Sequence, residues 1–262
     1  MAEACGQSDY LFRGIKAVVL DLDGTIYLGD RLIEGVLVLL NLFESYSVTP
    51  FFFTNNSSES RKQLFEKLLG MGIRLELKQV YGTGYATAVF VQEKGFQRVF
   101  CIGQKGLREE LNTMRIDVCE DERMAEALII GMDTDFDRVK LSKALHIMKM
   151  GGTAIACNRD NFYPGENGRM LPGCGSIVAA IESASGKKVQ YLIGKPNTFM
   201  LKLLNKDWNL NMKEILVIGD TYSSDIAMAK RCGSKSILIS KKKYRDTVAV
   251  ENIMQIEQFL RH

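Results

Sequence analysis

Two aspartates stand two residues apart where an apolar run ends. The run occupies residues 17–20, Asp21 and Asp23 follow it, and Gly24 supplies the sharp exit that glycine makes at little cost. Like charges at this spacing repel each other, and burial strengthens the repulsion. A divalent metal ion or a proton-transfer reaction would compensate such a pair, so we predict metal-assisted acid–base chemistry here. The alternative is a simple turn after a strand, because short motifs also occur without function.

Polar side chains of a coherent kind follow three further apolar runs. They are Thr54 and Asn55, then Lys195, then Asp220 with Asp225. Carboxylates suit a hard cation that prefers oxygen ligands. A lysine neutralises phosphate charge, while a hydroxyl group and backbone N–H groups at a helix start hold the remaining oxygens. Together these groups predict a site for a phosphate monoester and Mg²⁺, because phosphoryl transfer needs mainly positioning and charge stabilisation.

Three of these residues have simpler interpretations. Thr54 could be only a helix cap, Lys195 could be a surface lysine, and Asp225 could be an acid in the first turn of a helix. The combination with the other motifs favours the functional interpretation for each of them.

The elements that must position these groups alternate along the chain. Buried strands are predicted at residues 17–20, 48–53, 191–194, 215–218 and 236–239, and helices at 33–42 and 59–69, the latter capped by the polar segment 54–58. Asn197 is the predicted cap of a later helix. Alternating strands and amphipathic helices predict a parallel α/β architecture, in which ligands bind outside the carboxyl ends of the strands.

A middle block carries its own set of α/β signals. Helices are predicted at residues 86–94, 106–114, 138–150 and 176–185, and strands at 99–102, 127–130 and 153–157. This block is large enough to hold a small core of its own. Short turns that contain glycine, rather than low-complexity linkers, mark its two ends.

The composition excludes several other classes. The chain has 262 residues and a formal net charge of +3, which is too small to indicate nucleic acid or an anionic membrane as a partner. It has two histidines, so histidine-based catalysis and histidine metal sites are not expected. No secretory signal or transmembrane run is evident, and the scattered cysteines contain no CxxC pair, which indicates reduced thiols in the cytoplasm. The cysteines are Cys5, Cys101, Cys119, Cys157, Cys174 and Cys232.

Four ordered motifs resemble those of the haloacid dehalogenase superfamily. They are Asp21-Leu22-Asp23-Gly24-Thr25, Phe53-Thr54-Asn55-Asn56, Gly194-Lys195-Pro196 and Gly219-Asp220-x4-Asp225. The segment at residues 171–176 and its following helix are similar to the NagD-like, or para-nitrophenylphosphatase-like, branch. In that branch a large α/β cap is inserted between the second and third motifs. The resemblance covers about residues 15–259.

The resemblance implies a Rossmann-like parallel-sheet core domain with an inserted smaller α/β cap domain. The core would comprise residues 1–84 and 188–262, and the cap residues 85–187. It also implies that Asp21 is the nucleophile that forms an aspartyl-phosphate. Asp23 would protonate the leaving alcohol and then activate water, and its backbone carbonyl would bind the metal.

The remaining roles are also implied by the resemblance. Thr54 and the Asn55 N–H would contact phosphoryl oxygens, and Lys195 would balance the charge between nucleophile and phosphate. Asp220 would ligate Mg²⁺ together with Asp21. Asp225 would either ligate the ion or hold its waters.

The cap segment departs from the branch at two positions. Cys174 stands where a small hydroxyl residue is common. We expect this change to be harmless, although a thiol near the site entrance could make activity redox-sensitive. Asn158, Arg159 and Asp160 resemble the branch's specificity loop, with arginine where proline is often found. Arg159 could reach an anionic group of the substrate or face solvent. Asp133 is a weaker candidate in the cap.

The function that the resemblance implies is that of a Mg²⁺-dependent phosphatase for a small phosphorylated metabolite. A phosphotransferase or mutase differs only in the acceptor, and a non-catalytic binding protein on the same fold is a further alternative. The expected partner is a small phosphate ester, with neither nucleic acid nor membrane. The branch is compatible with a homodimer formed through the caps. The motifs do not name the substrate.

Overall fold

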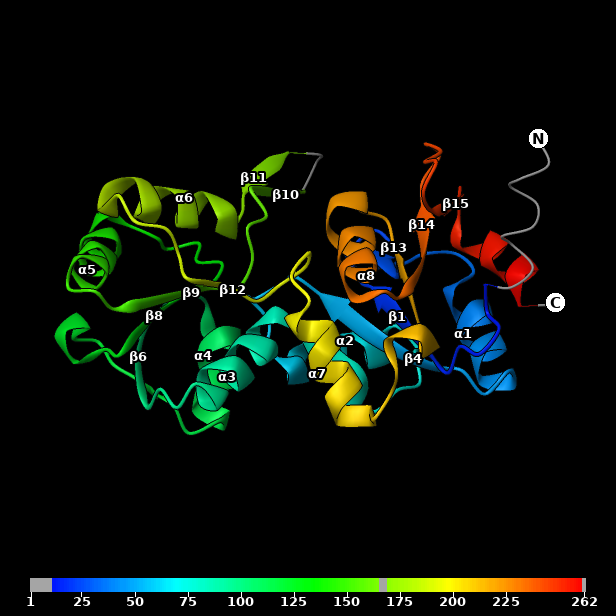
Figure 1. Cartoon of the computed structure of the whole chain (residues 1–262), viewed down its shortest axis with the longest axis horizontal. Coiled ribbons are helices and arrows are strands. Elements are labelled where there is room, and N and C mark those ends of the chain that lie inside the picture. Colours follow the sequence, from blue (N-terminus) through cyan, green and yellow to red (C-terminus); the bar gives the residue numbers. More distant parts are fainter. Residues whose placement is uncertain (1–10, 165–168, 261–262) are drawn as a thin grey trace. The chain divides into compact units, whose positions relative to one another are not determined.

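The computed structural model describes residues 11–164 and 169–260, so Cys5 and His262 lie outside the described part. The chain divides into two compact units. The first comprises Met1–Thr54, Phe65–Tyr81 and Thr198–His262, and the second comprises Asn55–Leu64 and Gly82–Asn197. Each unit is an α/β structure with its own parallel sheet (Figure 1). In the described residues no helix combines the length and apolar character needed to cross a membrane.

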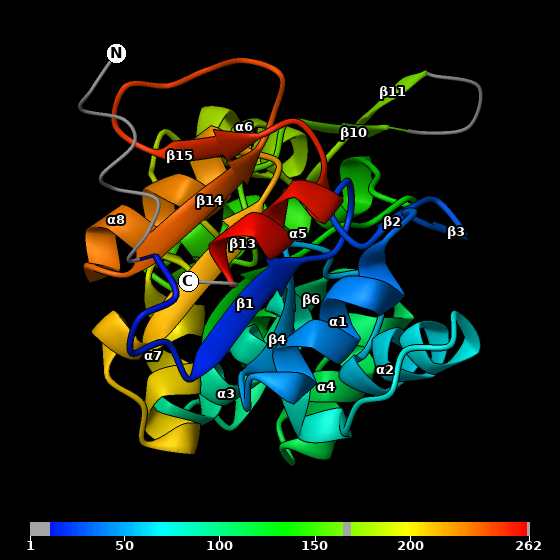
Figure 2. The ribbon, with the colours of Figure 1, turned by 90° about the vertical axis from the view of Figure 1, so that its right-hand side faces the viewer.

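The first unit is built on a sheet whose described strands follow the order β15-β14-β13-β1-β4-β5. Figure 2 shows this order from β15 to β4. Their bounds are β1 Ala17–Asp21, β4 Thr49–Thr54, β5 Val80–Gly82, β13 Ile215–Gly219, β14 Lys235–Ile239 and β15 Val248–Val250. Every residue of β1 and β13 is buried, as expected for central strands of a parallel sheet covered on both faces. A small hairpin of β2 (Tyr27–Leu28) and β3 (Arg31–Leu32) follows β1.

The helices of the first unit bury one face each. They are α1 Val36–Ser45, α7 Phe199–Trp208 and α8 Ala227–Cys232, and α2 (Arg61–Gly70) contributes all but its first turn. The 3₁₀ segment η6 (Ile253–Phe259) packs on α1. Trp208 at the end of α7 lies edge-on against Phe51 of β4, with ring centroids 4.8 Å apart. Two further 3₁₀ turns are η1 Leu77–Gln79 and η4 Met212–Glu214.

The second unit contains a described sheet in the order β12-β9-β8-β6-β7. Its elements are α3 Thr83–Glu93, β6 Arg98–Ile102, α4 Lys105–Thr113, β7 Asp117–Val118, η2 Glu122–Met124, β8 Ala127–Ile130, α5 Arg138–Lys149, β9 Thr153–Ala156, α6 Cys174–Ser185 and β12 Tyr191–Leu192. In Figure 1, α3 and α4 lie on one face of this sheet, and α5 and α6 lie on the other. A hairpin of β10 (Phe162–Pro164) and β11 (Met170–Pro172) precedes α6.

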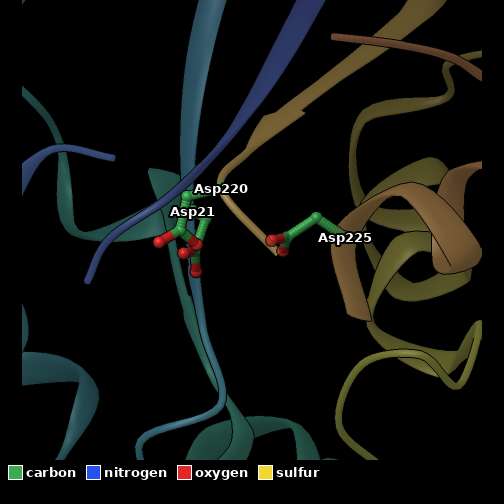
Figure 3. Close-up of side chains that lie close together, drawn as sticks. All are labelled: Asp21, Asp220 and Asp225. Carbon is green, nitrogen blue, oxygen red and sulfur yellow. The ribbon is translucent and has the colours of Figure 1, made fainter. Parts of the chain in front are cut away.

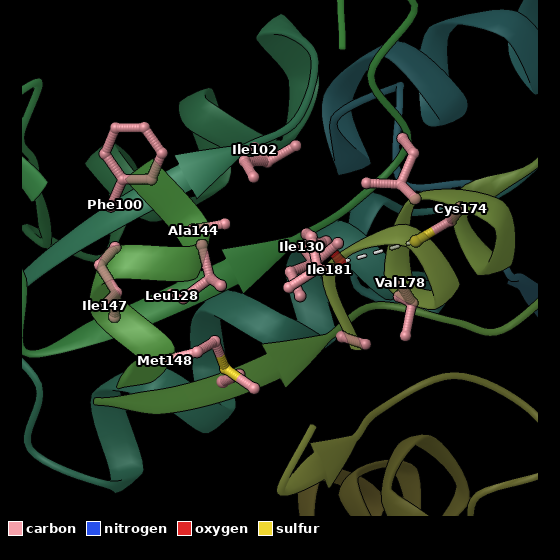
Figure 4. Close-up of a cluster of buried hydrophobic side chains, with 13 residues drawn as sticks. Phe100, Ile102, Leu128, Ile130, Ala144, Ile147, Met148, Cys174, Val178 and Ile181 are labelled. Atoms are coloured by element: carbon pink, nitrogen blue, oxygen red, sulfur yellow. Dashed lines mark hydrogen bonds between the residues drawn. The ribbon is translucent and has the colours of Figure 1, made fainter. Parts of the chain in front are cut away.

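The core between the sheet and helices α5 and α6 is apolar throughout. Phe100, Leu128 and Ile130 from the strands meet Ile147 and Ile181 from the helices (Figure 4). Burial of this cluster stabilises the second unit, at roughly 25 cal/mol per Å² of apolar surface removed from water. The prediction that the middle block carries its own core is therefore confirmed.

Three local predictions were wrong in detail. The predicted helix at 33–42 begins only at Val36, because Gly35 has a positive φ of 88° and ends the preceding loop. The helix predicted from residue 59 begins at Arg61, since Ser60 and Gln63 cap it reciprocally. The last predicted cap is one residue off, because Thr198 rather than Asn197 is the N-cap of α7.

Candidate active site

Asp21 occupies the last position of β1, and it is only 8% exposed. In the parallel register Leu20 of β1 pairs with Ile218 of β13, so the chain leaving β13 emerges beside Asp21. Asp220 is the first residue of that exit. The register of two buried strands therefore brings together two acidic residues that are far apart in the sequence.

Asp225 completes a cluster of three carboxylates. The carboxylate oxygens of Asp21, Asp220 and Asp225 lie within 4.8 Å of one another (Figure 3). Among the described residues, these three form a group of side chains that could hold a metal ion. Asp225 is 1% exposed and comes from the π-helical turn η5, Tyr222–Ile226. π-helical turns are rare and frequently occur at functional sites.

Thr221 ties the two acids of this loop together. Its N–H donates to Asp225 Oδ2 at 3.2 Å, and its hydroxyl donates to Asp220 Oδ1 at 2.9 Å. The motif predicts the acids but gives no role to Thr221. Its position next to Asp220, in a segment that must turn sharply, is the signal that could have identified it.

The donor set of the cluster fits Mg²⁺. All three side chains offer carboxylate oxygens, which is the ligand type that a hard cation prefers. Three carboxylates so close together repel one another in a partly buried site, and a divalent cation removes that repulsion. Gly24 has a positive φ of 84°, and a Cβ at this residue would overlap the Asp220 carboxylate. The absence of a side chain at Gly24 is therefore what lets the β1 exit approach Asp220.

Asp23 and Thr54 lie near Asp21, the first through the sequence and the second through strand pairing. The Asp23 side chain is exposed and does not belong to the group of three, while its backbone forms a bridge with Tyr27. Thr54 ends β4 and is 2% exposed. It lies one residue beyond Phe53, the register partner of Asp21, so it stands at the same edge of the sheet.

Asn55 and Lys195 belong to the second unit, where they are hydrogen-bonded to each other. Asn55 Oδ1 accepts from the Lys195 N–H at 2.8 Å, and Asn55 Nδ2 donates to the Lys195 carbonyl at 3.0 Å. Lys195 is 4% exposed, which is unusual for a lysine. Asn158 and Asp160 also contact Asn55, so four of the predicted site residues form one group.

Arg159 makes its contacts with Glu182 on α6. Its guanidinium donates to both carboxylate oxygens, at 2.5 and 3.3 Å, and Lys188 donates to Oε2 at 2.8 Å. Burial raises the pKa of Glu182, but the hydrogen bonds from Arg159, Lys188 and the Val189 amide outweigh it, so the pKa is lowered to about 2. The sequence signal for Glu182 was an acid on an apolar helix stripe, next to Ile181.

Replacing Glu182 by glutamine is expected to destabilise the protein by about 2 kcal/mol at pH 7, because Arg159 and Lys188 lose the buried charged acceptor of their hydrogen bonds. The loss should shrink as pH falls. The folded-state pKa of Glu182 is about 2, below its ordinary value of 4.5, so its contribution is present above pH 4.5 and disappears toward pH 2. Urea unfolding of wild type and variant at pH 7 and pH 3 measures this. Glu109→Gln, at a surface pair with Lys105, is the control and should cost less than about 0.5 kcal/mol.

Cys174 lies in the core of the second unit and not at an entrance. It is 2% exposed, its thiol donates to the Ile130 carbonyl at 3.6 Å, and burial raises its pKa (Figure 4). A buried, protonated thiol is a poor nucleophile and a poor target for oxidants. This burial agrees with the expectation that cysteine at this position is harmless, and it speaks against the alternative of a redox-sensitive thiol at a site entrance. Asp133 is also buried and is paired with Lys140 at 2.8 Å.

Comparison with known proteins places these motifs in a family. The model described as "Haloacid dehalogenase-like hydrolase" matches residues 18–117, and the one described as "HAD-hydrolase-like" matches residues 192–258. The sugar-phosphatase AraL of Bacillus subtilis (strain 168) is 30% identical over 223 residues, which are 85% of this chain and 82% of that protein.

Two solved structures have the same fold over nearly their whole length. The p-nitrophenyl phosphatase from Archaeoglobus fulgidus matches with a TM-score of 0.87 and 26% identity, covering 93% of this chain and 99% of that one. The 4-nitrophenylphosphatase from Thermotoga maritima matches with a TM-score of 0.88 and 27% identity, covering 95% of this chain and 98% of that one. The likeness includes both units of the chain.

Proposed function

The chain belongs to the haloacid dehalogenase-like hydrolases, as a phosphatase of their NagD-like, para-nitrophenylphosphatase-like branch, and we propose that it hydrolyses a small phosphorylated metabolite with Mg²⁺ as its cofactor. The observation that carries the proposal is the cluster of Asp21, Asp220 and Asp225. This cluster supplies the oxygen donors of a Mg²⁺ site and, in Asp21, a carboxylate that can attack phosphorus.

In the first half of the proposed reaction Asp21 is the nucleophile. A carboxylate oxygen of Asp21 attacks phosphorus, and the bond from phosphorus to the ester oxygen breaks. Asp23 gives its proton to that oxygen, so the product leaves as a neutral alcohol. The phosphoryl group is then held on Asp21 as an aspartyl-phosphate.

In the second half Asp23 acts as a base. Its carboxylate takes a proton from a water molecule while the water oxygen attacks phosphorus. The bond between phosphorus and Asp21 breaks, inorganic phosphate leaves, and Asp23 is again protonated for the next cycle. The exposed side chain of Asp23 supports this role, because the group must meet both the leaving alcohol and water.

The other predicted residues would stabilise charge. We propose that the Thr54 hydroxyl and the Asn55 N–H contact phosphoryl oxygens and that Lys195 offsets the negative charge of nucleophile and phosphate. Mg²⁺ held by Asp21, Asp220, Asp225 and the Asp23 carbonyl would neutralise charge that develops on the phosphoryl oxygens.

The substrate class is a small phosphate ester. One relative is named a sugar-phosphatase and two solved relatives are nitrophenyl phosphatases, which supports this class. Selection among such esters by Asn158, Arg159 and Asp160 stays a prediction, as do the domain boundaries at residues 84 and 187 and a homodimer formed through the caps.

Release of phosphate from para-nitrophenyl phosphate tests the proposal. We expect wild-type protein to release phosphate with Mg²⁺ and to stop in EDTA. Running the reaction in ¹⁸O-labelled water should place one label in the product phosphate, because water attacks phosphorus. Transfer of the phosphoryl group to an added alcohol, without ¹⁸O from water in the product, would instead identify a phosphotransferase. A folded protein that turns over neither this ester nor a panel of sugar phosphates would contradict the proposal.

A further inference from the structure

The side chain of Asn55 matches both backbone groups of Lys195. Its Oδ1 accepts from the Lys195 N–H at 2.8 Å and its Nδ2 donates to the Lys195 carbonyl at 3.0 Å. The amide group of Asn55 therefore bonds the N–H and the carbonyl of Lys195 in the way that the backbone of a neighbouring strand would. It fixes the backbone of Lys195 at two points.

The same asparagine also joins the segment at residues 157–160. The second Nδ2 hydrogen is donated to Asp160 Oδ2 at 3.0 Å. The backbone carbonyl of Asn55 accepts from Asn158 Nδ2 at 2.7 Å and from Thr83 Oγ1 at 2.8 Å. All the hydrogen-bonding groups of the Asn55 side chain are thus used, and three segments of the second unit meet at this one residue.

Gly194 shows how closely these segments approach. A Cβ at Gly194 would lie 2.6 Å from Asn55 Oδ1, 2.7 Å from the Cys157 carbonyl and 2.7 Å from Thr83 Cγ2. Real Cβ atoms do not come so near, and two of these neighbours are held by hydrogen bonds. Only glycine fits before Lys195, so the backbone of this segment has one position relative to Asn55.

We propose that the Asn55 side chain is a positioning residue for Lys195, and that Asn158 and Asp160 hold Asn55 in place. This inference rests on the proposed function, in which Lys195 offsets charge during phosphoryl transfer. The backbone N–H of Asn55 contacts the phosphoryl group in that function, whereas its side chain acts through Lys195. One residue thereby keeps the phosphate contact and the cation in a fixed relation, which electrostatic catalysis requires.

A double-mutant cycle tests the inference. Asn55→Ala removes the side chain and keeps the backbone N–H. We expect kcat for para-nitrophenyl phosphate to fall on the order of 100-fold, because a small misplacement of a catalytic group can have an effect of this size. In the background of Lys195→Met the same change should lower kcat less than about threefold, since a residue that acts through Lys195 has nothing left to position. Equal losses in both backgrounds would overturn the proposal.

Asn56→Ala is the matched control. The Asn56 side chain forms two local hydrogen bonds, accepting from the Ser58 N–H and donating to Glu59, each at 2.7 Å. Its replacement by alanine should lower thermal stability no more than Asn55→Ala does, while kcat stays within about threefold of wild type. A loss of kcat as large as that of Asn55→Ala would show that the whole turn matters and would overturn the specific role of Asn55.

Amide hydrogen exchange gives a readout that does not depend on turnover. The Lys195 N–H donates to Asn55 Oδ1, so its exchange measured by NMR should accelerate at least about tenfold in Asn55→Ala and not in Asn56→Ala. Unchanged protection would show that Asn55 does not hold Lys195. If wild-type protein releases no phosphate, the proposed function fails, and this exchange measurement still decides whether Asn55 fixes Lys195.

Discussion

Asp21→Asn is expected to lower phosphatase turnover by on the order of 10⁴-fold or more, because the amide nitrogen and oxygen cannot form the aspartyl-phosphate. The change is close to isosteric, and Asp21 is 8% exposed at the end of β1. It removes one of three carboxylates whose oxygens lie within 4.8 Å of one another. Like charges in a partly buried cluster repel, so the variant should unfold in EDTA at a temperature no lower than that of wild type.

Turnover and unfolding temperature together distinguish loss of a nucleophile from loss of the fold. Single-turnover acid quench with a ³²P-labelled substrate should trap a phosphoryl-protein in wild type and none in Asp21→Asn. Asp30→Asn is the control, because Asp30 is exposed in the loop between β2 and β3 and should leave turnover unchanged. A trapped phosphoryl-protein in Asp21→Asn would assign the nucleophile to another residue.

The strands that position the site were predictable because they are continuously apolar. Runs such as residues 17–20 and 215–218 contain no polar position, and only a strand covered on both faces accommodates them in a parallel α/β fold. Once these two strands pair in parallel, Asp21 and Asp220 must emerge at the same edge. The approach of Asp21 and Asp220 therefore follows from the strand pairing, whereas Asp225 is placed by the turn η5.

Contacts between side chains distant in the sequence were not predictable in this way. Nothing near Arg159 in the sequence indicates that Glu182, on a helix after an intervening hairpin, would accept both of its hydrogen bonds. The hairpin of β10 and β11 was itself missed, because its strands are short and exposed where described. Periodicity reports on burial against a core, and an exposed hairpin leaves no such pattern.

The burial of Cys174 shows a related limit. The resemblance to the family raised the alternative of a thiol near the site entrance, whereas α6 begins at Cys174 and the thiol donates to the Ile130 carbonyl. Which face of a helix is buried depends on the sheet that it covers. The apolar residues Ile177, Val178 and Ile181 of the same helix, which lie in the same core, carried the information about that face.

Removal of Mg²⁺ should lower turnover on the order of 10³-fold or more, since a bound cation supplies several kcal/mol of charge stabilisation in phosphoryl transfer. Metal binding should also be visible without activity. A cation that binds only the folded protein stabilises it by about 2.7 kcal/mol at 100 times its Kd, so Mg²⁺ should raise the unfolding temperature of wild type. Asp225→Asn, which removes a buried carboxylate of the cluster, should weaken that rise.

Replacing Mg²⁺ by Ca²⁺ distinguishes binding of an ion at the site from the ligand geometry that turnover needs. Its larger and looser oxygen shell should raise the unfolding temperature as Mg²⁺ does while supporting little turnover, because Asp21 would be held at the wrong distance and angle for attack. We therefore expect Ca²⁺ to inhibit in competition with Mg²⁺. Full activity with Ca²⁺ alone would show that the carboxylate cluster need not fix a small octahedral ion. A rise in unfolding temperature that persists in Asp225→Asn would place the cation elsewhere in the chain.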